Sequence, residues 1–259
     1  MASCDAPGLQ TLDEALEQIL SQLSPLHEQE WIPLSQADGR VLAADVQSCL
    51  DLPPADNSAM DGYAVRVEDL TEFDWLITQP ILPGECARIM TGAMVPEGAD
   101  TVIMQEDAEL GDNGKGRFLA AVKPAANIRR RGEEIASGDT VLSAGRRLRA
   151  ADIGLLASLG IDRVAVCCRV RVAIMATGNE LVAPGQALQA GQIYESNSQV
   201  LAVLLVRLGC TVIHFGIVPD DPQALRLAYQ NADNQADLVI ASGGVSVGEA
   251  DFSKQVLDE

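Results

Sequence analysis

Aromatic residues are scarce in this sequence, at 3%, although 47% of its residues are hydrophobic. The core must therefore be built from Ala, Val, Leu and Ile, which favours helices packed on sheets in layers over a ligand surface rich in aromatic rings. The 259 residues can bury a substantial core, in one large domain or in two to three smaller ones.

Positive charge is also scarce, because 18 Lys and Arg residues face 37 Asp and Glu residues and leave a formal net charge of -19. Such a surface repels nucleic acid and anionic membranes, so neither is expected as a partner. The exception is a positive segment at residues 123–149, which holds three acidic residues and seven basic ones: Lys123, Arg129, Arg130, Arg131, Arg146, Arg147 and Arg149.

Zinc-binding and secretion motifs are missing. The chain has two histidines, and its six cysteines form no C-x-x-C pair, so a zinc site is not expected. The first residues lack the basic and apolar regions of a signal peptide, and no apolar run is long enough to span a bilayer. These observations predict a soluble cytoplasmic protein with reduced thiols and no membrane partner.

What the sequence does contain, from residue 169 onward, is an alternation of strand and helix patterns. Apolar runs predict strands at residues 170–177, 211–215 and 237–242, and helical spacing predicts helices at residues 196–208 and 222–232. This βαβ order implies a parallel sheet, with any ligand expected beyond the carboxyl ends of its strands.

The earlier part of the chain shows other patterns. A capping box at Thr11 and Glu14 begins a predicted helix whose apolar residues repeat up to Leu23, and a second helix is predicted through residues 41–44. Short strand candidates separated by turns fill residues 68–123. A hairpin is predicted at residues 138–148, and a helix at residues 150–159 with a glycine cap at Gly160.

Together these patterns predict an α/β protein in which a parallel three-layer βαβ domain is preceded by an α/β N-terminal arm and an inserted small β domain. Residues 1–50 and 140–168 are expected to form a helical and extended dimerisation domain. Residues 51–139 are expected to form the inserted β domain, and residues 169–259 the α/β domain, incomplete at its C-terminal end.

The third strand of the α/β domain leads into a glycine-rich stretch. Gly243 and Gly248 have the spacing of a phosphate-binding P-loop, but Glu249 occupies the position where that motif needs Lys. Carboxylates at Glu249 and Asp251 would repel an anion unless a divalent cation lay between them. The alternative is a tight strand-to-helix turn followed by solvated acidic residues.

Acidic loops follow the other two strands as well. Thr177 and Glu180 lie just after the first strand and Asp220 after the second, so a parallel sheet brings them to the edge that also holds Glu249 and Asp251. This edge is too acidic for a bare phosphate, but with Mg²⁺ it becomes a site for a phosphate ester or another oxyanion. Each residue taken alone is equally a loop acid or a helix cap.

Two loops of the inserted domain carry polar residues. Asp61 precedes Gly62 at a tight turn, which by itself indicates an Asx turn. In residues 127–134 a run of arginines is followed directly by Glu133 and Glu134. This segment is either a salt-bridged surface turn or an anion-holding loop that also offers a carboxylate to a metal.

Five short motifs follow one another along nearly the whole chain: residues 56–64 (DNSAMDGYA), 89–93 (IMTGA), 128–133 (IRRRGE), 176–181 (ATGNEL) and 242–248 (SGGVSVG). In combination they resemble the molybdopterin molybdotransferases, the MoeA and gephyrin E-domain family. The resemblance implies a transferase of molybdenum cofactor biosynthesis that takes adenylylated molybdopterin and molybdate. With Mg²⁺ such an enzyme releases AMP and leaves molybdenum on the pterin dithiolene.

The resemblance also implies roles for single residues. The catalytic residues carried over from the family are Asp61, Thr91, Glu134, Glu180, Asp220 and Asp251. The residues expected to bind the cofactor are Thr177, Gly178, Ser242, Gly243, Gly244, Val245, Ser246 and Gly248, and those expected to bind metal are Glu180, Asp220, Glu249 and Asp251. The family further implies a homodimer whose cleft pairs the β domain of one subunit with the parallel-sheet domain of the other.

The chain departs from the family pattern in three places. Glu134 stands where the family usually has Asp, and residues 66–86 form a shorter segment without the usual glycine-rich stretch. The chain stops at Glu259 inside a helix predicted at residues 252–259, where the family continues into a Lys- and Pro-rich loop and a further β domain. We therefore expect the chain as given to be a weak or inactive catalyst.

Two other functions are alternatives to the transferase. The first is a non-catalytic pterin-binding module or dimeric scaffold, which the N-terminal helix suits equally well. The second is a pterin adenylyltransferase, which shares the sheet with its Gly-Gly-Val-Ser loop but resembles the parallel-sheet part alone. Residues 1–168 argue against this second alternative.

Overall fold

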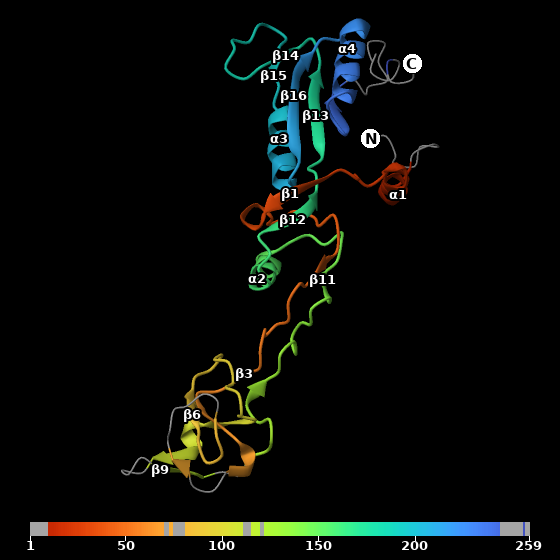
Figure 1. Cartoon of the computed structure of the whole chain (residues 1–259). Helices are drawn as coiled ribbons and strands as arrows, with labels where there is room; N and C mark the ends of the chain where they lie inside the picture. The colour runs from red at the N-terminus through yellow and green to blue at the C-terminus, as the bar shows by residue number, and fades with distance from the viewer. Residues whose placement is uncertain are drawn as a thin grey trace. The chain divides into compact units, whose positions relative to one another are not determined.

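The structure is a computed structural model that describes residues 10–69, 73–74, 81–110, 115–119, 122–243 and 256. The chain divides into two compact units, both drawn in Figure 1. The first unit comprises Met1–Ile32, Gly39–Ala43 and Ala165–Glu259, and the second comprises Pro33–Asp38 and Ala44–Val164. The three-domain division expected from the sequence stays a prediction.

A three-stranded parallel sheet forms the centre of the first unit. Its strands have the order β16-β13-β17, with β13 at Arg171–Thr177, β16 at Thr211–Val218 and β17 at Leu238–Ser242. The helices α3 (Asn197–Leu208) and α4 (Pro222–Asp233) connect these strands. The five elements predicted between residues 170 and 242 are therefore present, and the α/β class is confirmed.

The central strand β13 is buried on both faces because a helix covers each face of the sheet (Figure 1). Successive residues of a strand point to opposite faces, so β13 needs apolar residues at every position. One set packs with Leu205 of α3 and the other with Leu225 of α4: Val172 and Ile174 lie on the α3 side, and Ala173 and Met175 on the α4 side.

The two helices begin and end where their sequences dictate. Gly209 adopts a φ of 91° just after α3 and lets the chain turn toward β16. Asp221 precedes α4, where its carboxylate accepts a hydrogen bond from the Ala224 amide at 2.8 Å and Pro222 occupies the first helical turn. These signals keep the connections short, so the residues after each strand stay close to the sheet.

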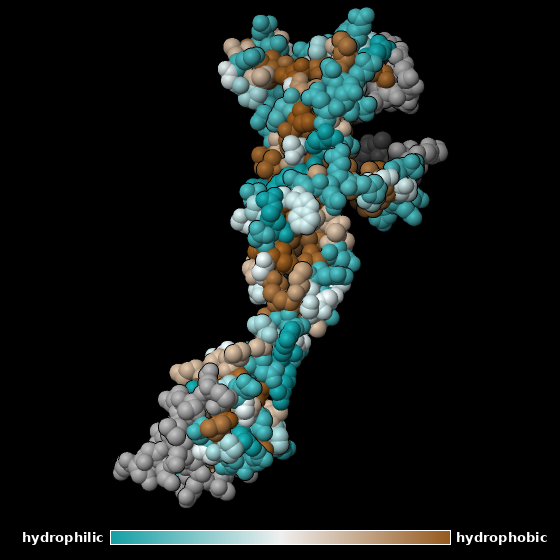
Figure 2. Space-filling model, viewed as in Figure 1, coloured by the Kyte–Doolittle hydropathy of each residue, from teal (hydrophilic) through white to brown (hydrophobic). Residues whose placement is uncertain are grey.

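The first unit also contains the helix α1 (Leu12–Gln22), which begins at the predicted capping box. The Thr11 hydroxyl accepts from the Glu14 amide, and the Glu14 carboxylate accepts from the Thr11 amide. No residue of α1 is buried. Its apolar residues are exposed instead, as is the residue that follows the helix: Leu12, Leu16, Ile19, Leu20 and Leu23. Figure 2 shows in brown the hydrophobic residues that reach the surface on one face of the molecule.

The helix predicted through residues 41–44 is wrong. Leu42 lies in an extended segment and forms an antiparallel bridge with Val166, and both side chains are buried. A run of four apolar residues is too short to nucleate a helix, and strand pairing buries it equally well. Other short strands pair as β1 (Gln29–Pro33) with β12 (Arg163–Cys167) and β14 (Leu181–Val182) with β15 (Ile193–Tyr194).

Two three-stranded antiparallel sheets form most of the second unit, and they confirm the short strands predicted between residues 88 and 120. One sheet has the order β6-β4-β7, and the other has the order β5-β9-β8. Their strands are β4 (Gly62–Val65), β5 (Phe73–Asp74), β6 (Ala87–Ile89), β7 (Thr101–Met104), β8 (Ala108–Leu110) and β9 (Lys115–Phe118).

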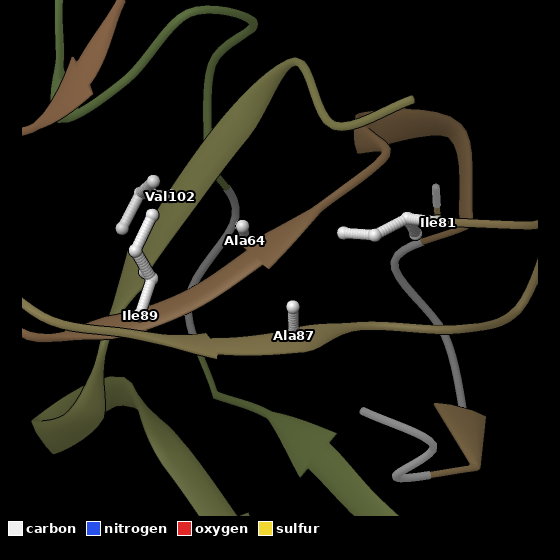
Figure 3. Packing of buried hydrophobic residues seen from close by; sticks show 5 residues of the cluster. All are labelled: Ala64, Ile81, Ala87, Ile89 and Val102. Atoms are coloured by element: carbon white, nitrogen blue, oxygen red, sulfur yellow. The ribbon is translucent and has the colours of Figure 1, made fainter. Parts of the chain in front are cut away.

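Apolar side chains cover both faces of the β6-β4-β7 sheet. Burial raises the pKa of Cys86 to about 12, so its thiol stays neutral and serves as a small apolar group. The buried residues are Ala64, Ile81, Ala87, Ile89 and Val102 on one face (Figure 3), and Tyr63, Val65, Cys86 and Ile103 on the other.

Shorter elements complete the second unit. β2 (Val46–Gln47) pairs with β11 (Thr140–Leu142), and β3 (Asn57–Ser58) pairs with β10 (Ile128–Arg129). The hairpin predicted at residues 138–148 is therefore wrong, because β11 pairs with a strand distant in sequence. The remaining helices are α2 (Ala150–Ser158), followed by Gly160 as predicted, and the 3-10 helices η1 (Leu34–Gln36), η2 (Val67–Asp69) and η3 (Gln105–Asp107).

Among the helices that the structure describes, none is both long enough and apolar enough to cross a bilayer. The helix predicted at residues 252–259 lies outside the described residues except for Val256, which is helical.

Gly62, at the start of β4, has no room for a side chain. A Cβ atom there would lie 1.8 Å from the carbonyl oxygen of Ile103 on the neighbouring strand β7. We expect Gly62→Ala to lower the free energy of unfolding by roughly 3 kcal/mol, because one of two hydrogen-bonded strands must move. Urea unfolding followed by circular dichroism measures this loss.

Gly154→Ala is the matched control for Gly62→Ala. Gly154 lies inside α2, and a Cβ atom there meets no other atom within 4 Å. Alanine has the higher helix propensity, so this variant should gain about 0.5–1 kcal/mol of stability. A Gly62→Ala protein that unfolds at the same urea concentration as the unchanged protein would contradict the expected clash.

Candidate functional site

The carboxyl ends of the three parallel strands meet at one edge of the first-unit sheet. Thr177 ends β13 and lies beside Val218, the last residue of β16. Ser242 ends β17 and lies beside Ala176. The loops that follow these strands start at this carboxyl edge, which is where parallel sheets bind their ligands.

Two of the predicted carboxylates lie at the carboxyl edge. The loops after β13 and β16 are joined by reciprocal hydrogen bonds, from the Asn179 amide to Asp220 Oδ2 at 3.2 Å and from the Asp220 amide to Asn179 Oδ1 at 3.3 Å. The Glu180 carboxylate folds back over Gly178, where a Cβ atom would lie 2.8 Å from both carboxylate oxygens. The structure thus brings Glu180 and Asp220 to the end of the strand that carries Thr177.

Gly243 determines how closely the end of β17 approaches β13. Its φ is 98°, in the left-handed region. A Cβ atom there would lie 2.4 Å from the carbonyl oxygen of Thr177 and 2.8 Å from the Thr177 hydroxyl. Only glycine fits both the backbone conformation and the space. The turn after β17 therefore begins with bare backbone beside Thr177, as an oxyanion site requires.

The start of α3 also lies at the carboxyl edge, and the sequence reasoning missed its polar residues. Asn197 Nδ2 donates to the Ser242 hydroxyl at 3.5 Å, and Ser198 is the next residue of the helix. The order of elements could have predicted them. A helix that joins two parallel strands runs back along the sheet, so it begins at the edge where the first strand ends. Polar residues in that first turn are therefore candidates.

Two buried hydroxyls near this edge have no hydrogen-bond partner among the described residues. They belong to Thr177 and Ser198, which are 4% and 6% exposed. The Ser198 amide, by contrast, donates to the buried Glu195 carboxylate at 2.8 Å. An unpaired buried hydroxyl lowers stability, so a ligand that hydrogen-bonds to these groups would be favoured.

Several predicted ligand residues lie outside the described residues: Gly244, Val245, Ser246, Gly248, Glu249 and Asp251. Within the described ranges, no three His, Cys, Asp or Glu side chains are grouped so that they could hold a metal ion. Glu180 and Asp220 still fit Mg²⁺ by their chemistry, because this ion prefers hard carboxylate oxygens. The Thr177 hydroxyl, at the end of the same strand, has no partner among the described residues.

Asp61 and Thr91 form a second polar cluster, in the second unit. The amide and the hydroxyl of Thr91 both donate to Asp61 Oδ1, each at 2.7 Å. These contacts hold the pKa of Asp61 below its ordinary value. The hydrogen bond from the Thr91 amide lowers it most, then the hydrogen bond from the Thr91 hydroxyl, and then the positive charge of Arg88. Asp61 is therefore an ionised, fixed hydrogen-bond acceptor at neutral pH.

The arginine-rich segment forms a salt-bridged turn. Arg130 pairs with Asp56 at 2.5 Å, and Arg131 pairs with Asp51 at 2.6 Å. The pKa of each aspartate lies below its ordinary value. The largest cause is a hydrogen bond from a backbone amide, that of Ser137 for Asp51 and that of Arg131 for Asp56. The next is the hydrogen bond from the paired arginine. The pairing of these two arginines favours the salt-bridged turn over an anion-holding loop.

Glu134 follows this turn and has an exposed side chain. Its amide donates to the Leu52 carbonyl at 3.0 Å. No described contact joins Glu134 to Asp61 or Thr91, so the structure does not bring these three predicted residues into one cluster.

Two protein-family models match this chain, one after the other. The model described as "MoeA N-terminal region (domain I and II)" matches residues 10–160. The model described as "Probable molybdopterin binding domain" matches residues 173–259, which include the carboxyl edge.

Individual relatives match nearly the whole chain. A molybdopterin molybdenumtransferase from Haemophilus influenzae is 45% identical over 260 residues, and one from a Nostoc species is 40% identical over 269 residues. These alignments cover 96% and 97% of this chain but 64% and 61% of the relatives. The crystal structure of the molybdopterin biosynthesis MoeA protein from Pyrococcus horikoshii OT3 is similar with a TM-score of 0.81 at 33% identity, over 89% of this chain and 65% of that one.

Thr177→Val tests whether the unpaired hydroxyl at the carboxyl edge serves a ligand. Valine has nearly the same shape without the polar atom, so the free energy of unfolding should stay the same or rise by up to about 1 kcal/mol. Binding should weaken at the same time. The measurement is the rise in melting temperature on addition of AMP, which should shrink in this variant.

Thr101→Val is the matched control for Thr177→Val. Thr101, in β7 of the second unit, is also fully buried, and its hydroxyl has no partner in the described part of the chain. Its replacement should change the free energy of unfolding in the same way, but the rise in melting temperature on addition of AMP should stay the same. A Thr177→Val protein that loses more than about 2 kcal/mol would show that the hydroxyl has a structural partner instead.

Proposed function

Because the chain belongs to the MoeA family of molybdopterin molybdenumtransferases, we propose that it transfers molybdenum from molybdate to adenylylated molybdopterin and releases AMP, in a reaction that requires Mg²⁺. Membership of the family places the chain in molybdenum cofactor biosynthesis. The chain spans less than two thirds of the length of the relatives named above, so the proposal concerns the part of the site that these residues contribute.

One observation carries the proposal: two carboxylates, an unpaired hydroxyl and bare glycine backbone share the carboxyl edge of the segment that the molybdopterin-binding model matches. Both proposed substrates are anions, since molybdate is an oxyanion and the adenylylated pterin contains a phosphate anhydride. Hydroxyls and backbone amides can bind such oxygens, provided that a cation offsets the carboxylates.

Each group at the carboxyl edge has a definite proposed role. Glu180 and Asp220 would hold Mg²⁺, and the reciprocal bonds with Asn179 keep the Asp220 carboxylate in place. When bound, the ion supplies positive charge that polarises the phosphoryl oxygens. The hydroxyls of Thr177 and Ser198 would orient the substrate by donating hydrogen bonds to its oxygens.

Asp61 is proposed as a hydrogen-bond acceptor for the substrate. It uses one carboxylate oxygen for both hydrogen bonds from Thr91. The other oxygen has no hydrogen bond from the described residues, and we propose that it accepts one from a donor group of the substrate. Because Thr91 holds the carboxylate before the substrate arrives, little ordering is left for the binding step.

Glu180→Gln and Asp220→Asn test the metal-dependent reaction. Each variant keeps the shape of the side chain but removes a negative charge that would hold Mg²⁺. We expect kcat/KM for molybdate-dependent AMP release to fall by about a hundredfold or more, with a higher Mg²⁺ requirement. The assay follows AMP at several Mg²⁺ concentrations, and a chelator should stop the reaction.

Asp221→Asn is the matched control, because Asp221 is adjacent in the chain but caps α4. Asparagine caps helices as well as aspartate does, so stability and AMP release should both be preserved. Activity that survives Glu180→Gln or that needs no Mg²⁺ would contradict the proposed site. Absence of AMP release in the unchanged protein would match the weak or inactive catalyst expected of this chain as given, and would favour the scaffold alternative for it.

We further propose that the protein forms a homodimer through α1. The capping box stabilises this helix, yet none of its residues is buried within the chain. Its apolar side chains recur at helical spacing along one stripe, from Leu12 at 83% exposed to Leu23 at 60% exposed. A second copy that offers the same stripe would cover it with a symmetric interface.

Leu16→Glu tests this interface. A charge in the middle of the stripe should weaken a dimer strongly, because an unpaired carboxylate would be buried in it. Light scattering coupled to size-exclusion chromatography should show a shift toward monomer. Glu17→Gln, next in sequence but off the stripe, should leave the dimer intact, and a monomeric unchanged protein would refute the interface.

We propose the cytoplasm as the place of action. Among the described cysteines, Cys49, Cys86, Cys167, Cys168 and Cys210 are all free thiols. Free thiols suit a compartment that keeps cysteines reduced.

A further inference from the structure

Tyr194 presents an aromatic ring at the surface of a protein that has few such rings. Of the aromatic side chains whose exposure the structure describes, Trp31 and Tyr194 are the exposed ones, and Tyr194 is 47% exposed. Its ring is held at both ends, because its backbone belongs to β15 and its phenol donates to the Gln186 carbonyl at 2.9 Å. Such a ring leaves apolar area for a ligand to cover and loses little freedom when the ligand binds.

The backbone around Tyr194 belongs to the carboxyl edge (Figure 1). The preceding residue, Ile193, donates its amide hydrogen to the Glu180 carbonyl at 2.9 Å. The following residue, Glu195, has a buried carboxylate that accepts from the Ser198 amide at 2.8 Å. Tyr194 therefore lies between the backbone of a proposed metal ligand and the first turn of α3.

We infer that Tyr194 is a specificity-determining residue of this site, whose ring is a platform on which a flat heteroaromatic ring of the substrate stacks. The inference rests on the proposed function, in which the phosphate anhydride of the substrate lies at the carboxyl edge. The adenylylated pterin carries such a ring on each side of the anhydride, an adenine and a pterin. Stacking on tyrosine needs no positive charge, so it can operate at an acidic edge.

The bond between the Tyr194 phenol and Gln186 also admits a purely structural role, in which Tyr194 only fixes the loop at residues 183–192. The two roles need different atoms. Stacking needs the ring, whereas the loop contact needs the phenol oxygen. Phenylalanine keeps the ring and removes the oxygen, and leucine removes both, so these two replacements separate the roles.

Tyr194→Leu and Tyr194→Phe test the inference by calorimetric titration in the presence of Mg²⁺. The probes are AMP, hydroxymethylpterin, and ribose phosphate, which has no ring base. Tyr194→Leu should raise the Kd of AMP or of the pterin by roughly tenfold, and the probe that is affected identifies the stacked ring. Tyr194→Phe should bind like the unchanged protein, and ribose phosphate should bind all three proteins alike. In the AMP-release assay, Tyr194→Leu should raise KM more than it lowers kcat.

Trp31→Leu is the matched control, because it removes an exposed ring from β1, which pairs with β12 and not with the three parallel strands. It should leave the affinities for all probes unchanged. The inference is overturned if Tyr194→Phe binds as weakly as Tyr194→Leu, or if ribose phosphate loses affinity equally. It is also overturned if Tyr194→Leu, shown to be folded by circular dichroism, binds both ring probes like the unchanged protein.

Failure of the proposed function gives a different result. An unchanged protein that binds a ring probe but releases no AMP fails the proposed reaction, while the titrations still decide the role of Tyr194. An unchanged protein that binds neither AMP nor the pterin overturns the stacking platform itself.

Discussion

At two glycines a neighbouring backbone comes so close that no Cβ atom would fit, and these contacts position both candidate clusters. In the first unit Gly243 lies against the carbonyl of Thr177, and in the second Gly62 lies against the carbonyl of Ile103. Each contact adjoins a side chain of the candidate site, since Thr177 ends β13 at the carboxyl edge and Asp61 precedes Gly62. A methyl group at either glycine would push paired strands apart, so the position of each cluster depends on a residue that has no side chain.

Charge in this protein is balanced locally rather than over the whole surface. Arg130 and Arg131 are each paired with an aspartate of the same unit, so these two cations are already compensated. Compensation of anionic substrates is therefore assigned to another group, the metal ion proposed at the carboxyl edge. Because such interactions act over a few ångströms and salt screens longer ones, a net charge of -19 does not prevent anion binding.

The sequence predicted the elements of the first unit well because their patterns are local. Apolar periodicity located the strands and helices between residues 170 and 242, and the crossover rule then implied the parallel sheet. Strand pairing between distant segments leaves no local pattern in the sequence. The bridge from Leu42 to Val166 therefore stands where a helix was predicted, and the pairing of β11 with β2 where a hairpin was predicted. In the candidate site, the motifs indicated Asp61 and Thr91, but their hydrogen bonds depend on the pairing of β4 with β6, which no local pattern shows.

Buried polar atoms without a hydrogen-bond partner lower the stability of the fold. Within the described residues they belong to Asn57, Thr101, Thr177 and Ser198. Each such atom costs about 1–3 kcal/mol, against a net stability of about 5–15 kcal/mol for a typical domain. Stability alone would favour valine at Thr177, because the shape would hardly change. Thr177 and Ser198 differ from Asn57 and Thr101 in lying near the carboxyl edge, where parallel sheets bind their ligands, so their hydroxyls support a ligand there. As neutral donors they can bind anionic oxygens without adding charge to an acidic site.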